Sequence, residues 1–133
     1  MATSPSFIST PRVGVASLST GQSAFTSGTS TNVEDVLSAV SAGTRVLEVV
    51  ITTDGDPADS VVVLWLHNGT TNTVFDAVDI GNPAAASTTA APYRTTVTYQ
   101  NLIIPSGWKL QASVTVTPTS GTIKVFALGG DLT

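Results

Sequence analysis

Apolar and polar residues alternate with a period of two over much of the chain, which is typical of strands with one buried face. The pattern is clearest in residues 108–117, where Trp, Leu, Ala and Val occupy alternate positions and Lys, Gln, Ser and Thr fill the positions between them. This segment is predicted to be a strand, with Trp108 in phase with the buried set. We therefore expect Trp108 in the core or at its rim, and a sugar-stacking surface is the alternative.

Similar patterns, separated by turn residues such as Asp54-Gly55, Asn68-Gly69 and Pro105-Ser106-Gly107, predict further strands. The predicted strands cover residues 12–18, 33–40, 45–53, 60–67, 73–80, 94–104, 108–117 and 122–128. Residues 33–40 also fit the spacing of a helical face, but a strand is favoured there. About eight short strands predict an all-β protein, a single antiparallel β-sandwich of the jelly-roll-like type. We expect an N-terminal arm with a possible first strand over residues 1–32 and the β-sandwich domain over residues 33–133.

The segment SVVVLWL, residues 60–66, breaks the alternation because it is apolar on both faces. A half-exposed antiparallel strand should carry polar residues on its outer face, so something is expected to cover this one. The cover is either the N-terminal arm or a second copy of the chain. If it is a second copy, Val62, Leu64 and Leu66 are candidate subunit contacts.

Composition excludes several classes of function. Charged residues make up 11% of the 133 residues and the net charge is −4, which argues against binding to nucleic acid. No stretch approaches the ~20 apolar residues of a membrane span, so no membrane partner is expected. The first residues are rich in Ser, Thr and Pro. We expect Phe7, Ile8 and Arg12 in this arm to contact a neighbouring molecule rather than the core.

Residues that could support catalysis or bind a metal are few. His67 is the only histidine and the chain has no cysteine, so neither a nucleophilic dyad nor a zinc site can be assembled. Asp54, Asp56 and Asp59 share one turn, but their spacing departs from that of a calcium-binding EF-hand loop. We therefore expect no enzyme activity, no metal and no cofactor.

A resemblance adds to this interpretation. The order of SAGTRVLEVVITT, VVVLWLHNGTTNTVFDAVDI, a Pro/Ala/Thr-rich loop, LIIPSGWKLQASVTV and IKVFALGGDL resembles small β-rich structural proteins of tailed bacteriophages, over roughly residues 36–131. The resemblance implies a virion component, either a capsid decoration (cement) protein or a fibre or baseplate module. Capsid decoration is favoured, which would place the protein on the outer surface of the virion after its synthesis in the host cytoplasm. The implied partners are the major capsid protein and other copies of the chain, in a dimer or trimer. The resemblance supplies no functional residue.

Two further functions stay open beside capsid decoration. One is a tail fibre or baseplate module, and the other is a glycan-binding module for host attachment. In the second case Tyr93, Tyr99 or Trp65 would provide the stacking surface for a sugar.

Overall fold

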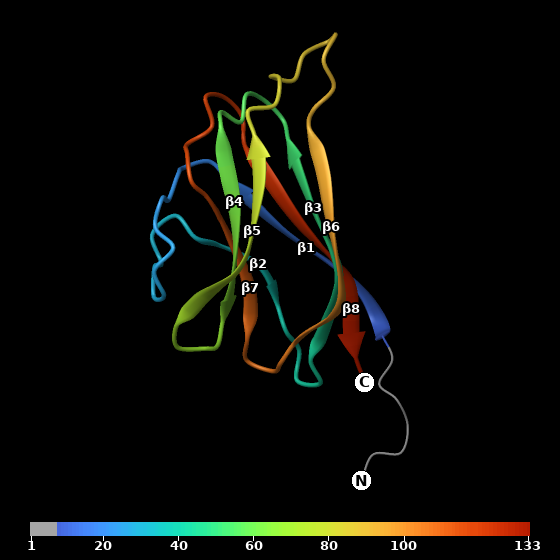
Figure 1. Ribbon diagram of the computed structural model, residues 1–133. Coiled ribbons are helices and arrows are strands. Elements are labelled where there is room, and N and C mark those ends of the chain that lie inside the picture. Colours follow the sequence, from blue (N-terminus) through green and yellow to red (C-terminus); the bar gives the residue numbers. More distant parts are fainter. Residues whose placement is uncertain (1–7) are drawn as a thin grey trace.

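A computed structural model describes residues 8–133 as eight strands in two antiparallel four-stranded sheets that pack face to face (Figure 1). The strands are β1 (Ile8–Leu18), β2 (Glu34–Ser38), β3 (Thr44–Thr53), β4 (Ser60–His67), β5 (Asn72–Gly81), β6 (Arg94–Ile104), β7 (Lys109–Val114) and β8 (Ile123–Leu132). The first sheet has the strand order β1-β8-β3-β6, and the second sheet has the order β2-β7-β4-β5. The predicted antiparallel β-sandwich is thus confirmed. The described part of the chain contains no helix long and apolar enough to span a membrane.

The strands follow the predicted pattern closely, and the largest differences are at the start of β1 and at the ends of β7 and β8. β8 continues to Leu132, past the predicted end at residue 128. β1 begins at Ile8 rather than near Arg12, because it pairs along its length with β8, from Ile8 beside Leu132 to Leu18 beside Ile123. β7 ends at Val114, earlier than the alternation suggested. The ambiguous segment around residues 33–40 is a strand, as favoured. From Ile8 onward, the expected arm is therefore part of the sandwich.

The core lies between the two sheets and is built from the inward-facing residues of both. Burying one such aliphatic side chain contributes roughly 1.5–3 kcal/mol to folding. Val62 and Leu64 of β4 are among its members and have no exposed surface. The largest fully buried members are Leu18, Ile51, Leu64, Ile104, Leu110 and Ile123.

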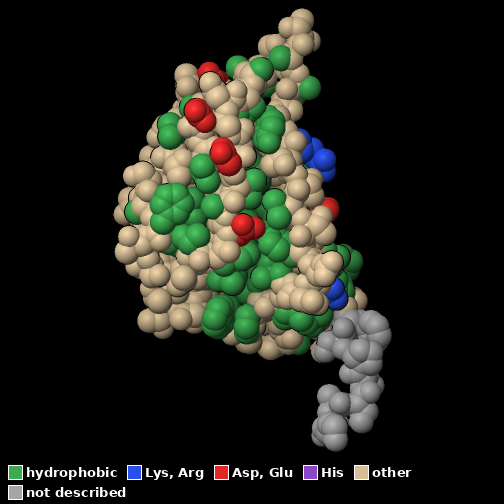
Figure 2. All heavy atoms as spheres, in the orientation of Figure 1, with side chains coloured by type: hydrophobic (Ala, Val, Ile, Leu, Met, Phe, Trp, Pro, Cys, Tyr) green, Lys and Arg blue, Asp and Glu red, His purple; other side chains and the backbone are tan. Residues whose placement is uncertain are grey.

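One side of the sandwich, between the edge strands β5 and β6, is closed by side chains alone. Figure 2 shows hydrophobic side chains gathered there, with acidic side chains along β5. The Tyr99 hydroxyl of β6 donates a 2.7 Å hydrogen bond to Asp76 Oδ2 of β5, and the Tyr99 ring lies 5.9 Å from that of Phe75, centre to centre. Burial, together with this bond to a carboxylate, raises the pKa of Tyr99 above its ordinary value of 10.0.

Because the folded chain holds the Tyr99 proton more tightly than the unfolded chain, stability should fall in alkali. The contribution is complete below about pH 10 and is lost as the pH rises from there toward the raised pKa of the folded state. We expect Tyr99→Phe to lose about 0.5–1.5 kcal/mol at neutral pH and to show a weaker alkaline decline. Urea unfolding between pH 7 and 11 measures both effects. Tyr93→Phe is the control, since no hydrogen bond of its hydroxyl occurs among residues 8–133, and it should keep the wild-type decline.

Candidate functional site: the outer face of the first sheet

The outer faces of the two sheets differ, and the second sheet is covered by its own chain. Val62 and Leu64 point into the core, so their neighbours on β4, Val63 and Trp65, point outward, yet both have no exposed surface. Trp65 Nε1 donates a 2.9 Å hydrogen bond to Ser113 Oγ of β7. These two outward-pointing side chains are therefore as inaccessible to solvent as the core residues.

The cover of the second sheet is the segment of residues 19–33, which connects β1 to β2 and lies beside this sheet in Figure 1. Its backbone is fastened to the sheet at several points. Gln22 N donates to Val114 O at 2.7 Å, and Gly28 N donates to Asn72 O at 3.0 Å. In return, Asn72 Nδ2 donates to Thr29 O at 2.6 Å. The predicted cover of the two-faced strand is thus supplied within one chain.

The first sheet has no such cover within the described residues, although its outer face is apolar. Val13 is 65% exposed and Val15 is 51% exposed, both on β1, and Leu47 of β3 is 40% exposed. Across the sheet, Val15 lies beside Phe126, and Val13 lies beside Leu128. We call this surface the apolar face and define it by the residues Val13, Val15, Leu47, Phe126 and Leu128.

A groove of about 510 Å³ crosses the apolar face. It is lined by Pro11, Arg12, Val13, Leu47, Glu48, Thr98, Leu128 and Gly129. Arg12 at its rim is held by its own chain, since Nη1 donates to Ser38 O at 2.7 Å and pairs with Asp131 Oδ1 at 3.1 Å. The Asp131 carboxylate also accepts a 2.9 Å bond from Thr44 Oγ1. The groove therefore has an apolar floor. At its rim, Arg12 already forms an ion pair with Asp131 of its own chain.

The structure separates the residues that the sequence suggested as partner contacts. Val62 and Leu64 were wrongly placed on an outer face: alternation gives two sets of positions, and these two residues belong to the set that faces the core. Ile8 and Arg12 share β1, and Arg12 borders the apolar face. Leu66 is half-buried on the second sheet, distant in the topology from β1, and Phe7 lies outside the described residues.

Sequence reasoning missed the exposed valines of β1, although a signal was present. In the segment RVGVASL the valines alternate with Gly14 and Ala16, and alternation alone would bury the larger residues. The structure buries the small ones instead. A Cβ added to Gly14 would collide with Val36 O of β2, so only glycine allows the two sheets to approach there. Gly14 therefore turns Val13 and Val15 toward solvent.

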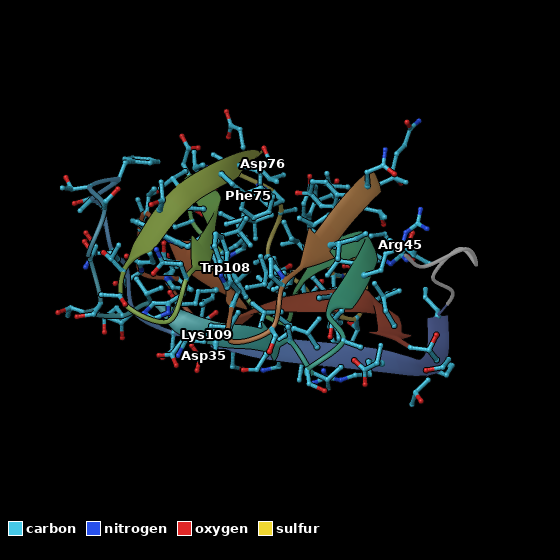
Figure 3. The ribbon with its side chains drawn as sticks, turned by 90° about the horizontal axis from the view of Figure 1, so that it is seen from below. Asp35, Arg45, Phe75, Asp76, Trp108 and Lys109 are labelled. Carbon is cyan, nitrogen blue, oxygen red and sulfur yellow. The ribbon has the colours of Figure 1, made fainter. Side chains whose placement is uncertain are left out.

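A second groove, of about 220 Å³, lies at the end of the sandwich where β4 turns into β5. Trp108 and Phe75 form part of its wall, as Figure 3 shows from below, and Arg45 lies well apart from them on β3. Trp108 is half-buried and packs against the core, as expected for a residue at the core rim. The groove is completed by Leu66, Asn68, Thr71, Thr73 and Val74.

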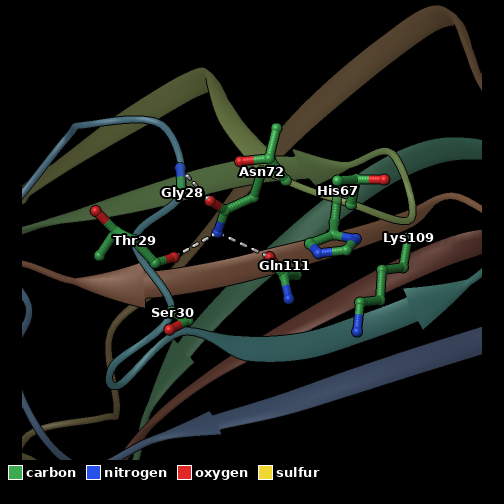
Figure 4. Close-up of a pocket in the computed structure, with 9 residues that line it drawn as sticks. Gly28, Thr29, Ser30, His67, Asn72, Lys109 and Gln111 are labelled. Carbon is green, nitrogen blue, oxygen red and sulfur yellow. Dashed lines mark hydrogen bonds between the residues drawn. The ribbon is translucent and has the colours of Figure 1, made fainter.

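A polar pocket of about 400 Å³ lies on the other side of the same turn (Figure 4). Asn72 and Gln111 are buried in its wall and bonded to each other, with Asn72 Nδ2 donating to Gln111 Oε1 at 3.0 Å. Burial opposes ionisation of the nearby Asp35, but hydrogen bonds from Gln111 and Lys109 outweigh it and lower the Asp35 pKa. The bonds in and beside this pocket fasten residues 19–33 to the second sheet and join β2 to β7 within that sheet.

The remaining candidate residues are bonded within the β4–β5 turn or between two connecting loops. His67 Nδ1 accepts a 3.0 Å bond from Gly69 N in the β4–β5 turn. The Asp54 carboxylate accepts bonds from the backbone and side chain of Thr122, which lower its pKa, and Lys124 Nζ lies 3.7 Å away. Among residues 8–133, no three His, Cys, Asp or Glu side chains come together as metal ligands would.

Comparison with known proteins adds no relative. No protein-family model matches the chain, and no curated protein or solved structure matches it either.

Proposed function

We propose that this chain is a structural protein that binds a larger protein assembly through the apolar face, and that the assembly is a bacteriophage capsid. The observation that carries the proposal is the contrast between the two sheets. The second sheet is sealed by residues 19–33, whereas the first exposes Val13, Val15 and Leu47. Contiguous exposed apolar surface on a small domain is typical of a site that another protein covers.

The topology supports a virion role. Consecutive strands pass from one sheet to the other at every connection except the β4–β5 hairpin, which gives the orders β1-β8-β3-β6 and β2-β7-β4-β5. We interpret this arrangement as a jelly roll, a fold frequent in viral capsid and lectin domains. Together with the resemblance of residues 36–131 to phage structural proteins, it favours capsid decoration over other assemblies.

The chemistry of the apolar face suits attachment to a repeating lattice. The five side chains that define the apolar face are uncharged, so their contacts do not weaken as salt screens charge. One such contact is weak, but a protein that engages several sites at once gains from high local concentration by orders of magnitude. A decoration protein of modest affinity per contact can thus bind a capsid stably.

A carboxylate on the apolar face should break attachment without unfolding the chain. We expect Val13→Asp to weaken binding about tenfold or more, because desolvating an unpaired carboxylate at an apolar contact costs ~1–3 kcal/mol or more. Co-sedimentation with phage particles that lack the protein measures the binding. Retention of the wild-type melting temperature shows that the fold is intact.

Val116→Asp is the matched control, because Val116 is also an exposed valine but follows β7 outside the first sheet. It should bind particles as the wild type does. Equal binding by Val13→Asp and wild type would exclude the apolar face as the attachment site. Failure of every form to bind particles would contradict the capsid role itself.

A glycan-binding module on a tail fibre or baseplate is the alternative function, and the Trp108 groove favours it. The groove joins two aromatic side chains to hydroxyl and amide groups, the combination that stacks on and hydrogen-bonds to a sugar ring. Trp65 cannot serve as the platform because it is fully buried. Titration with neutral oligosaccharides, followed by tryptophan fluorescence in wild type and Trp108→Phe, separates this function from capsid attachment.

A further inference from the structure

The sandwich has four edge strands, β1 and β6 in the first sheet and β2 and β5 in the second. An unprotected edge presents unpaired backbone groups to which another strand can add, and proteins block most of their edges with proline, charges, bulges or shortness. Three of the four edges carry such protection. β6 is the exception over its first half.

The protection of the other three edges is visible in their residues. β1 contains Pro11, which has no N–H to donate, and β2 is only five residues long and begins with two acidic residues. On β5, Asp76 Oδ1 accepts a 2.8 Å bond from Ala77 N, and Asp79 Oδ1 accepts one of 2.8 Å from Gly81 N. These carboxylates occupy donors that an added strand would need.

β6 runs for eleven residues without proline, and its only charged residue is Arg94 at its start. Its outward-pointing groups follow from the ladder with β3. Thr53 N donates to Tyr93 O, so this pair is hydrogen-bonded, and the alternation of an antiparallel ladder continues the bonding at Thr95 and Val97. The N–H and C=O groups of Arg94, Thr96 and Thr98 therefore point away from the sheet.

The regular edge ends after Thr98. Glu48 pairs with Thr98 but Val46 pairs with Leu102, so β6 bulges between these two positions. Arg45 Nη2 reaches across from β3 and donates a 2.6 Å bond to Gln100 O within the bulge. An added strand thus finds regular free backbone only over residues 94–98.

We propose that β6 pairs antiparallel with β6 of a second copy of this chain, about a two-fold axis at Thr96. Thr96 then faces Thr96 of the second copy, and Arg94 faces its Thr98. The N–H and C=O groups of these residues all point outward from their own sheet. Each facing pair therefore exchanges two backbone hydrogen bonds. Two first sheets become one continuous sheet, in the isologous geometry of a symmetric dimer.

Charge complementarity supports a second copy as the occupant. Arg94, Thr98 and Glu48 lie on the same face of the first sheet, since Glu48 is directly opposite Thr98. In the dimer, Arg94 extends over Thr98 of the second copy toward its Glu48, and the symmetry creates this contact twice. Neither Arg94 nor Glu48 forms an ion pair within residues 8–133 of a single chain. The pairing also places two apolar faces side by side.

Cysteine cross-linking tests the register, because the chain has no cysteine of its own. Residues in a hydrogen-bonded pair have Cα atoms about 5.5 Å apart, within the range of a disulfide. We expect Thr96→Cys to form a covalent dimer on mild oxidation. Thr98→Cys is the register control and should stay uncross-linked, since it faces position 94. Absence of a Thr96→Cys cross-link, or equal cross-linking of both variants, would overturn the pairing.

Charge reversal tests the complementarity on the protein alone, independently of capsid binding. Light scattering of the wild type should give twice the mass of the 13.5 kDa chain. Arg94→Glu should weaken the dimer about tenfold, and Arg94→Glu combined with Glu48→Arg should restore it. A wild type that is monomeric or trimeric would overturn the proposal, and so would a double variant no tighter than the single one. Particle binding by a monomeric wild type would leave the proposed function standing while this pairing failed.

Discussion

Replacing Leu64 with aspartate is expected to unfold the protein rather than to separate subunits. Leu64 has no exposed surface and lies in the core between the sheets. Leu64→Asp would place a carboxylate there without a partner, at a cost of several kcal/mol against a total stability of about 5–15 kcal/mol. Circular dichroism should show loss of the cooperative thermal transition, and light scattering should show aggregates.

Val13→Asp is the control for this substitution, because it introduces the same charge at a strand position that is 65% exposed. It should fold and melt as the wild type does. The contrast isolates burial as the cause of unfolding. A Leu64→Asp chain that folds with only its oligomeric state changed would show that this face of β4 meets a partner instead of the core.

These two positions also show how far the sequence predicts the fold. The alternation of apolar and polar residues located most strands, because the side chains of a half-buried strand face the core at every second position. Turn residues marked the ends of the strands. Trp108 was correctly assigned to the buried set. Where both sets are apolar, as in β4, alternation cannot distinguish the face that meets the other sheet from the face that residues 19–33 cover.

The apolar face was harder to foresee for a different reason. Its exposure depends on the close approach of β1 to β2, which requires Gly14, and distant contacts of this kind leave no periodic signal. The segment that seals the second sheet is also inconspicuous. It holds the sheet through backbone hydrogen bonds, such as Gln22 N to Val114 O, and not through a run of large apolar side chains.

The proposed dimer extends the same reasoning to the sheet edges. The composition of β6, rich in threonine and nearly free of charge, is visible in the sequence, but its position at an edge is not. Only the strand order identifies the free backbone of Thr96 and Thr98, and only the register brings Arg94 and Glu48 onto one face. Edge pairing uses the outward backbone groups of β6, whereas capsid attachment uses the apolar side chains of β1, β3 and β8, and the two surfaces meet at Glu48 and Thr98.

Trp65 is fully buried on the covered side of the second sheet, where its indole is bonded to Ser113. Trp65→Ala should destabilise the fold by ~3–5 kcal/mol, because it removes a fully buried indole and deprives Ser113 Oγ of its donor. Such a loss lowers the melting temperature by roughly 10–20 °C in a domain of this size. Trp108→Ala should also destabilise the fold, but less, since Trp108 is only half-buried.

Local loosening should accompany the loss of stability, because we infer that Trp65, which is fully buried on the outer side of the second sheet, is covered by the segment that Gln22 and Gly28 fasten to that sheet. Backbone amides of residues 19–33 should exchange hydrogen faster in Trp65→Ala than in Trp108→Ala, when both are compared at equal global stability in adjusted urea. Hydrogen exchange read by mass spectrometry resolves this segment. Equal exchange in the two variants would mean that the segment is held by its backbone bonds alone, and that the indole of Trp65 stabilises the sheet without supporting its cover.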